Sequence, residues 1–310
     1  MYTFSKLRGG DLMSTEGLRG VIAAIATPVT SAGKPDCARL ISRAGYLLSN
    51  GCDGLNLLGT TGEATSFSLV ERLGVMEAVS KAGLPLDRFM VGTGAASVSD
   101  AAELTRAAAQ FGFAGALLLP PFYYKGISDD GISRYVERVL TAPGSRAIPL
   151  YLYNFPALSG VQYSVSSVSL LLTRFGNTIA GLKDSSGDMA YATQIAQLSA
   201  SLRVFPSNEG VLLRARAGEF AGCISATANL NARHCASAYH EGDEDALKRA
   251  SAARAMFTGL PLVAGIKAVL ARITGEGEWA ELVPPLTKPT KEEVETLWAR
   301  FGQMPADTWS

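Results

Sequence analysis

Lys183 is the residue of this chain whose type and position most clearly suggest chemistry. It follows the apolar run 178–182 and precedes Asp184 and further polar residues, so it stands where a buried strand would end. Taking an ammonium group out of water is costly, and desolvation favours the neutral amine, which is a nucleophile. The alternative is a lysine that reaches solvent or pairs with Asp184 or Asp188. Its position alone leaves both roles open.

A loop of glycines and threonines offers a second group of functional atoms. Gly59, Thr60, Thr61, Gly62 and Glu63 follow the apolar run 54–58. Glycines let the backbone approach a ligand closely, and free N–H groups can bind an anion such as a carboxylate. The threonines add hydroxyl groups. An ordinary polar turn is the alternative interpretation.

Aromatic residues follow two other apolar runs. Tyr151 and Tyr153 alternate and therefore share one face of a predicted strand. A tyrosine at the end of that strand could transfer protons, although most buried tyrosines are core residues. Tyr123 and Tyr124 come after Pro120-Pro121 in a loop that suits an interface as well as a site.

The residue types that hold metals and cofactors are scarce. The two histidines, His234 and His240, are six residues apart, whereas neighbours on one helical face are three or four apart. The four cysteines form no C-x-x-C pair. The run 92–97 begins like a dinucleotide-binding fingerprint but lacks its third glycine. We therefore expect no metal and no cofactor.

Composition narrows the range of partners and compartments. The 310 residues are 47% hydrophobic and 18% charged with a formal net charge of zero, which argues against nucleic-acid or membrane-surface binding. No apolar stretch is long enough to span a bilayer. Residues 1–16 lack the apolar segment of a signal peptide, and we expect a flexible extension there. Unpaired cysteines favour a cytoplasmic protein.

Short apolar runs alternate with amphipathic stretches. The expected strands cover residues 21–26, 54–58, 89–92, 114–119, 149–153, 179–183, 203–206 and 222–225. Each is almost continuously apolar, as a strand buried on both faces should be. Helices are expected in between, and Asp36, Ser97, Ser128, Ser164 and Asp188 precede them as N-caps.

This order of elements predicts a (β/α)₈ TIM barrel over residues 17–243. A doubly wound sheet would also alternate, but the short, evenly spaced strands favour the barrel. Three helical stretches without a strand then predict a C-terminal helical region over residues 244–310. Lys267 lies in an apolar stretch of that region, and we expect it to be structural.

The functional motifs together resemble the dihydrodipicolinate synthase / N-acetylneuraminate lyase family. The matching runs are Gly59-Thr60-Thr61-Gly62-Glu63, Tyr153-Asn154-Phe155-Pro156, Gly181-Leu182-Lys183-Asp184 and the stretch 221–229. The resemblance extends from about residue 20 to residue 301. It implies a TIM barrel with a helical C-terminal region, a homotetramer, and a Schiff base between a lysine and pyruvate.

The resemblance also implies roles for individual residues. Lys183 would form the Schiff base, Tyr153 would be the acid and base, and Thr60 would relay protons to it. Thr61, with the backbone N–H groups of the loop from Gly59 to Gly62, would hold the pyruvate carboxylate. The carbonyl of Ile224 would lie near the imine.

In the synthases of this family a tyrosine from a neighbouring subunit reaches the site. Tyr123 is the match in this chain, and Tyr124 is the alternative because the loop is one residue longer than usual.

The second substrate is predicted from the residues that differ between branches. The synthases bind a semialdehyde carboxylate with an arginine where this chain has Leu158, which cannot make that contact. The run 156–160 resembles the lyase branch. That branch binds a polyol with an Asp-Glu pair, which here is Asn208 and Glu209.

The sequence therefore predicts a pyruvate lyase or aldolase that acts on a 2-keto-3-deoxy sugar acid or related hydroxy-keto acid. The alternatives are dihydrodipicolinate synthase, a dehydratase or deaminase on the same scaffold, and a non-catalytic barrel that binds keto acids.

Overall fold

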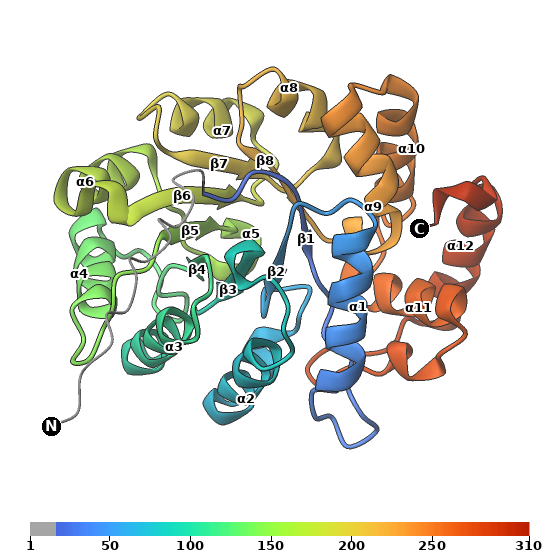
Figure 1. Ribbon diagram of the computed structural model, residues 1–310, viewed down its shortest axis with the longest axis horizontal. Coiled ribbons are helices and arrows are strands. Elements are labelled where there is room, and N and C mark those ends of the chain that lie inside the picture. Colours follow the sequence, from blue (N-terminus) through green and yellow to red (C-terminus); the bar gives the residue numbers. More distant parts are fainter. Residues whose placement is uncertain (1–16, 310) are drawn as a thin grey trace, which may run out of the picture.

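The computed structural model describes residues 17–309, and its centre is a barrel of eight parallel strands (Figure 1). The predicted extension 1–16 lies outside the described residues. The strands are β1 Gly20–Ala24, β2 Gly54–Leu57, β3 Phe89–Gly92, β4 Gly115–Leu118, β5 Leu150–Asn154, β6 Ile179–Asp184, β7 Arg203–Pro206 and β8 Gly222–Ser225. They pair in the order β7-β6-β5-β4-β3-β2-β1-β8.

A hydrogen bond joins the two ends of this sheet. The Ala221 N–H, just before β8, donates to the Val204 carbonyl of β7 over 2.9 Å. The sheet is thus nearly closed, which confirms the predicted TIM barrel and excludes the doubly wound alternative. Almost every strand residue is buried, because helices cover the barrel outside and side chains fill it inside.

Helices surround the barrel and continue beyond it. They are α1 Cys37–Ser49, α2 Leu69–Ser80, α3 Val98–Phe111, α4 Asp129–Leu140, α5 Pro156–Ser159, α6 Val165–Phe175, α7 Met189–Ala196, α8 Leu212–Arg216, α9 Ala228–Ala236, α10 Glu244–Ala255, α11 Leu262–Thr274 and α12 Lys291–Gly302. Each of the five predicted N-cap side chains accepts a backbone N–H of the first turn, and these predictions are confirmed. The short helix α5 was not predicted.

The barrel interior is solid at its amino-terminal end. The ring of Tyr151 lies across it and contacts Phe205, with ring centroids 6.1 Å apart. A Cβ at Gly115 or at Gly181 would stand 2.6 Å from this ring, so only glycine leaves room for it. Because this end is filled, the functional atoms have access to solvent only at the opposite, carboxyl end of the strands.

The segment after Glu244 forms α10, α11 and α12 and contains no strand in the part that the structure describes. Figure 1 shows α11 and α12 on the side of the barrel where α1 and α9 lie. Trp279, Ile266 and Leu270 form a separate apolar cluster with Leu230 of α9. The division at residue 243 stays a prediction, since this region also packs on the barrel.

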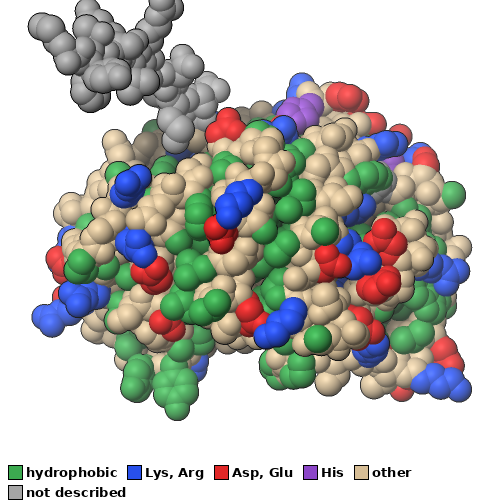
Figure 2. Space-filling view, turned by 60° about the horizontal axis from the view of Figure 1, so that its bottom comes forward, with side chains coloured by type: hydrophobic (Ala, Val, Ile, Leu, Met, Phe, Trp, Pro, Cys, Tyr) green, Lys and Arg blue, Asp and Glu red, His purple; other side chains and the backbone are tan. Residues whose placement is uncertain are grey.

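The surface agrees with the balanced composition. On the face in Figure 2, basic and acidic side chains are interspersed with hydrophobic ones. Within residues 17–309, no helix is long and apolar enough to cross a bilayer. His234 and His240 lie at the surface, where their rings contact the Asp307 carbonyl and the Asp53 carboxylate.

Candidate functional site

Lys183 and Tyr153 are direct neighbours inside the barrel. Strands β5 and β6 pair in a register that sets Tyr153 opposite Lys183. The Lys183 Nζ lies 4.4 Å from the centroid of the Tyr153 ring, and both residues are 3% exposed. The structure therefore brings together the predicted nucleophile and the predicted acid–base group.

The acidic residues near Lys183 in sequence are engaged elsewhere. Asp184 points to the other face of β6 and accepts hydrogen bonds from Asn154 Nδ2 at 2.8 Å and Ser186 Oγ at 2.9 Å. Burial raises the pKa of the Asp184 carboxyl. Asp188 caps α7. Lys183 makes no ion pair among residues 17–309, so the predicted alternative of a paired lysine is excluded for these two carboxylates.

Thr60 connects the glycine–threonine loop to Tyr153. Its Oγ1 lies 3.1 Å from the Tyr153 hydroxyl, at hydrogen-bond distance. A proton on the Tyr153 oxygen can therefore be passed to a second hydroxyl without any movement of the backbone. This contact supports the relay that the sequence predicts for Thr60.

The same loop has unpaired backbone N–H groups, and its Thr61 lines the cavity that Lys183 lines. Thr61 is 6% exposed and lines the cavity. The N–H groups of Thr61 and Gly62 donate to no other residue in the described part of the chain. A Cβ at Gly59 would stand 2.7 Å from the Asn56 Oδ1, so a larger residue here would have to displace the Asn56 side chain. Unpaired N–H groups of this kind suit a carboxylate.

Glu63 closes the loop and fixes it to the rest of the molecule. Its backbone has φ 54°, a left-handed conformation that is uncommon outside glycine. Its carboxylate accepts hydrogen bonds from Lys267 Nζ and, over 2.8 Å, from the Val283 N–H. Lys267 also donates to the Thr27 carbonyl at 3.1 Å. Both side chains of the ion pair are fully buried.

These groups open into a cavity of about 680 Å³ at the carboxyl end of the barrel. Ile224 of β8 lies in its wall, fully buried, and Leu158 of α5 lies at its rim, 66% exposed. The C-terminal region supplies another part of the wall, with residues Pro261, Leu262, Val263, Ala264, Pro285, Leu286 and Thr287. No site residue was predicted in this region, and it nevertheless shapes the cavity.

Asn208 and Glu209 do not line this cavity, and neither do Gly59 and Gly62 of the predicted carboxylate loop. Asn208 is exposed and accepts the Gly210 N–H at 2.9 Å. Glu209 is fully buried, and its carboxylate accepts hydrogen bonds from the hydroxyls of Ser225 and Thr227. These contacts occupy the groups that were predicted to hold a polyol.

Tyr123 and Tyr124 lie on the surface, away from the cavity of their own chain. They are 74% and 73% exposed, and their rings pack edge to face with centroids 5.4 Å apart. The prediction that one of them completes the site of a neighbouring subunit remains a prediction.

Several cavity residues were not found from the sequence. Arg254 of α10 lines the wall with its side chain 32% exposed, and its Nη1 lies 3.3 Å from the Glu209 Oε2. Ser185 and Ser207 add hydroxyl groups after β6 and β7. The two serines follow strand ends and could have been considered. Arg254 lies in a helix whose sequence has the pattern of a surface helix, so the sequence did not indicate that it lines a cavity.

Comparison with known proteins identifies the family. The model of the dihydrodipicolinate synthetase family matches residues 17–300. The chain belongs to this family. A protein described as an uncharacterized DapA-like lyase from Chloroflexus aurantiacus is 33% identical and covers 94% of this chain and 98% of its own. N-acetylneuraminate lyase from Enterobacter sp. (strain 638) is 30% identical over 75% of this chain and 77% of its own.

A solved structure agrees with this assignment. The dihydrodipicolinate synthase from Agrobacterium tumefaciens str. C58 superposes with a TM-score of 0.86 at 29% identity, covering 93% of this chain and 99% of that one. As a member of the dihydrodipicolinate synthetase family the protein is a lyase, which confirms the expected enzyme class. Relatives with different names match the chain similarly. The comparisons therefore place the protein among the class I pyruvate aldolases and lyases and do not identify its substrate.

Proposed function

We propose that the protein cleaves a 2-keto-3-deoxy sugar acid, or a related hydroxy-keto acid, into pyruvate and an aldehyde through a Schiff base on Lys183. The observation that carries this proposal is the buried, unpaired Lys183 amine 4.4 Å from the Tyr153 ring. An amine that no carboxylate holds, and that lines a cavity, can approach the keto carbon of a bound substrate.

In the first stage the Lys183 amine attacks the keto carbon. The keto oxygen takes up protons and leaves as water, and an iminium forms. Tyr153 supplies and removes these protons, and Thr60, 3.1 Å from its hydroxyl, exchanges them with the site. The substrate carboxylate is held by the Thr61 side chain and the free N–H groups of Thr61 and Gly62.

In the second stage the iminium accepts an electron pair. Tyr153 removes the proton of the hydroxyl on C4, the C3–C4 bond breaks, and its electrons move into the iminium to give an enamine. The aldehyde leaves. Protonation of the enamine at C3 and hydrolysis of the imine then release pyruvate and restore the Lys183 amine.

The walls of the cavity support a polar tail on the substrate. Ser185, Ser207 and Thr287 offer hydroxyls, and Arg254 offers a guanidinium that Glu209 holds in place. A guanidinium can bind either hydroxyls or a distal carboxylate. The predicted role of Glu209 in polyol binding is thus better assigned to Arg254, which Glu209 orients.

The test is a pyruvate-release assay with 2-keto-3-deoxygluconate, run beside a synthase assay with pyruvate and aspartate semialdehyde. Release of pyruvate by the wild type and its loss in Lys183→Ala support the proposal. Faster turnover of the semialdehyde establishes the synthase alternative, which the Agrobacterium structure favours. If neither assay shows turnover by folded protein, a non-catalytic barrel that binds keto acids becomes the better account.

Leu158→Arg sharpens the choice between these substrates. Leu158 lies at the rim, 66% exposed, where a longer side chain fits without displacing the core. If the semialdehyde site of this chain lacks only its arginine, Leu158→Arg raises synthase activity above the wild type. Equal synthase activity in both proteins contradicts this explanation.

We also propose that the protein is a homotetramer in which the exposed pair of Tyr123 and Tyr124 contacts a second copy. Two large exposed rings side by side are typical of an interface. Light scattering after size-exclusion chromatography should give four times the chain mass. A monomer that is fully active contradicts this proposal.

A further inference from the structure

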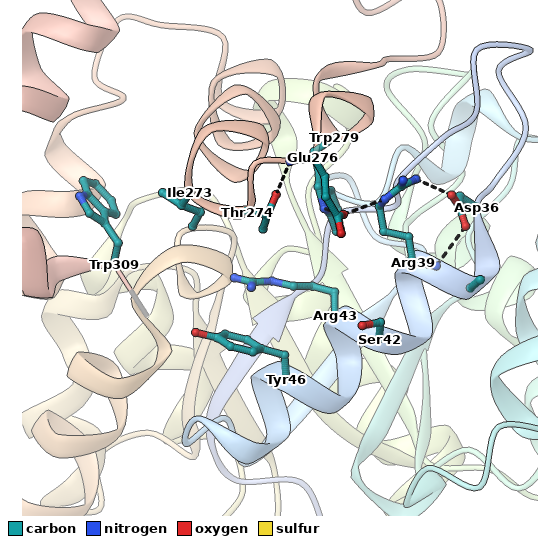
Figure 3. A pocket seen from close by; sticks show the side chains of 11 residues that line it. Asp36, Arg39, Ser42, Arg43, Tyr46, Ile273, Thr274, Glu276, Trp279 and Trp309 are labelled. Carbon is teal, nitrogen blue, oxygen red and sulfur yellow. Dashed lines mark hydrogen bonds and ion pairs between the residues drawn. The ribbon is translucent and has the colours of Figure 1, made fainter.

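A second cavity, of about 560 Å³, lies between α1 and the C-terminal region (Figure 3). Its walls include Arg39, Arg43 and Tyr46 of α1, and Thr274, Trp279 and Trp309 from the other side. No residue in the described part of the chain lines both this cavity and the catalytic one. It is therefore a separate space, and its volume is typical of a small-molecule site.

Arg43 extends into this cavity, as Figure 3 shows. Only 7% of Arg43 is exposed. Its Nη2 donates to the Asn229 carbonyl, while its Nε has no hydrogen-bond partner. Its guanidinium carbon lies 4.5 Å from the centroid of the Tyr46 ring. Among residues 17–309 no carboxylate pairs with it, and burial lowers its pKa.

The carboxylates that line the cavity are already engaged by another arginine. Asp36 forms an ion pair with Arg39, and Glu276 accepts the Arg39 Nε at 2.9 Å and the Trp279 Nε1 at 3.1 Å. Figure 3 shows that these contacts lie together at one end of the cavity. The Arg43 guanidinium therefore has the Asn229 carbonyl and the Tyr46 ring as partners but no carboxylate among residues 17–309 to neutralise its charge, which is costly for a buried ion.

The walls of the cavity indicate the shape of a ligand whose negative charge would pair with Arg43. Trp279, Tyr46 and Trp309 give the cavity flat, aromatic surfaces. The Trp309 ring is itself held by stacking on Phe301, with centroids 4.6 Å apart and an interplanar angle of 5°. Such walls favour a planar apolar group over a hydrated ion.

We propose that this cavity binds a small aromatic carboxylate, with the carboxylate on Arg43 and the ring between Tyr46 and the tryptophans. A guanidinium with free N–H groups binds a carboxylate through charge-assisted hydrogen bonds. A ligand in this place contacts α1 and the C-terminal region together, so it also stabilises their contact.

The probe is 4-fluorobenzoate, whose binding to the full-length protein is followed by fluorine NMR. The neutral 4-fluorobenzamide has the same shape and tests the need for charge. The structure predicts saturable binding of the benzoate and no saturable binding of the amide. Equal binding of both compounds, or no saturable binding of the benzoate, overturns the proposal.

Two variants locate the site. Arg43→Met keeps much of the side-chain volume and removes the guanidinium, and Ser42→Trp places a bulky group at an exposed position of the cavity wall. Both should weaken binding by about tenfold or more, the size expected for lost charge-assisted hydrogen bonds. Ser42→Trp decides the question if Arg43→Met does not fold.

Matched controls separate this cavity from other sites. Arg106→Met removes an arginine of α3 that pairs with Glu103 at the surface, and it should bind the benzoate like the wild type. Lys183→Ala should also bind normally. If Lys183→Ala loses binding, or if Arg43→Met and Ser42→Trp keep wild-type affinity, the benzoate binds elsewhere and the proposal fails.

Discussion

Among residues 17–309 two lysines are buried, Lys183 and Lys267, and they differ in their partners. Lys267 is fully buried, and its Nζ donates to the Glu63 carboxylate and to the Thr27 carbonyl. Lys183 is 3% exposed and has the Tyr153 ring as its neighbour, with no carboxylate paired to it among residues 17–309. Burial alone does not distinguish a nucleophile from a structural cation.

The partners decide the chemistry of each amine. A carboxylate in contact with an ammonium favours the charged form, and a charged ammonium has no lone pair with which to attack a carbonyl. Burial lowers the pKa of Lys267, and the charge and hydrogen bond of Glu63 oppose that effect. No carboxylate of residues 17–309 holds the Lys183 Nζ, which lies beside the Tyr153 ring at the cavity. The comparison therefore supports the catalytic role proposed for Lys183 and a structural role for Lys267.

The two lysines are nevertheless connected. Glu63 directly follows the loop that carries Thr60 and Thr61, and Lys267 holds Glu63 through the buried ion pair. Thr60 in turn contacts the Tyr153 hydroxyl. If Tyr153 acts as the acid and base, as proposed, Lys267 is a positioning residue, because it holds the loop whose Thr60 contacts Tyr153.

The largest expected effect is on turnover when the unpaired lysine is removed. Lys183→Ala should lower kcat by roughly 10⁴–10⁶-fold, because a covalent mechanism cannot proceed without its nucleophile. Circular dichroism and thermal melting should show an intact fold, since no ion pair is broken. Substantial residual turnover would contradict the assignment.

Removal of the Tyr153 hydroxyl should have the next largest effect. Tyr153→Phe should lower kcat by roughly 10²–10⁴-fold, the range for lost general acid–base catalysis. Tyr151→Phe is the matched control, because Tyr151 lies on the same face of β5 but deeper in the barrel. Steady-state kinetics that show equal losses in both variants would mean that the effect is structural.

Lys267→Met tests the structural half of the comparison. It leaves the buried Glu63 carboxylate without its partner and should lower the free energy of unfolding by about 3–5 kcal/mol. The double variant Glu63→Gln with Lys267→Met should recover part of this loss. Lys288→Met is the control, because Lys288 pairs with Glu281 at the surface and should change stability by about 0–1 kcal/mol.

Kinetics of Lys267→Met separate positioning from stability. With the loop less well held, kcat should fall while borohydride still traps pyruvate on Lys183. A fall in stability without any change in kcat at a temperature where the variant is folded would restrict Lys267 to a purely structural role.

The smallest effect concerns pH. Because burial lowers the pKa of Lys267 in the folded state, the unfolded chain binds this proton more tightly between the folded pKa and the unfolded value near 10.5. The Lys267 contribution to stability therefore rises with pH in that window. Denaturant unfolding at several pH values should show the stability difference between wild type and Lys267→Met growing as the pH rises. A difference that shrinks contradicts the sign of the shift.

Much of the fold could be predicted because its signals are local. Each strand is an apolar run, and residues such as Ser97 and Asp188 cap helices through their own first turns. The proximity of the central site residues could also be predicted from the strands. In a parallel barrel the ends of all strands meet on one face, so Lys183, Tyr153 and Thr60 had to lie near one another.

The rest of the site depends on contacts between distant segments. Glu63 and Lys267 are 204 positions apart, and nothing in either local pattern indicates that they meet. Arg254 reaches the cavity from α10, which follows the barrel. Glu209 follows a strand end, as a ligand should, yet it turns toward Ser225 and Thr227. A position after a strand predicts that a residue lies near the site. The direction of its side chain follows only from the structure.

The most direct test of the central claim is to trap the Schiff base. The protein is incubated with pyruvate and sodium borohydride, digested, and mapped by mass spectrometry. The assignment predicts one reduced pyruvate adduct, on the peptide that contains Lys183, and none on the peptide that contains Lys267. An adduct on Lys267, or folded protein with no adduct, would contradict the claim that the unpaired buried lysine is the nucleophile.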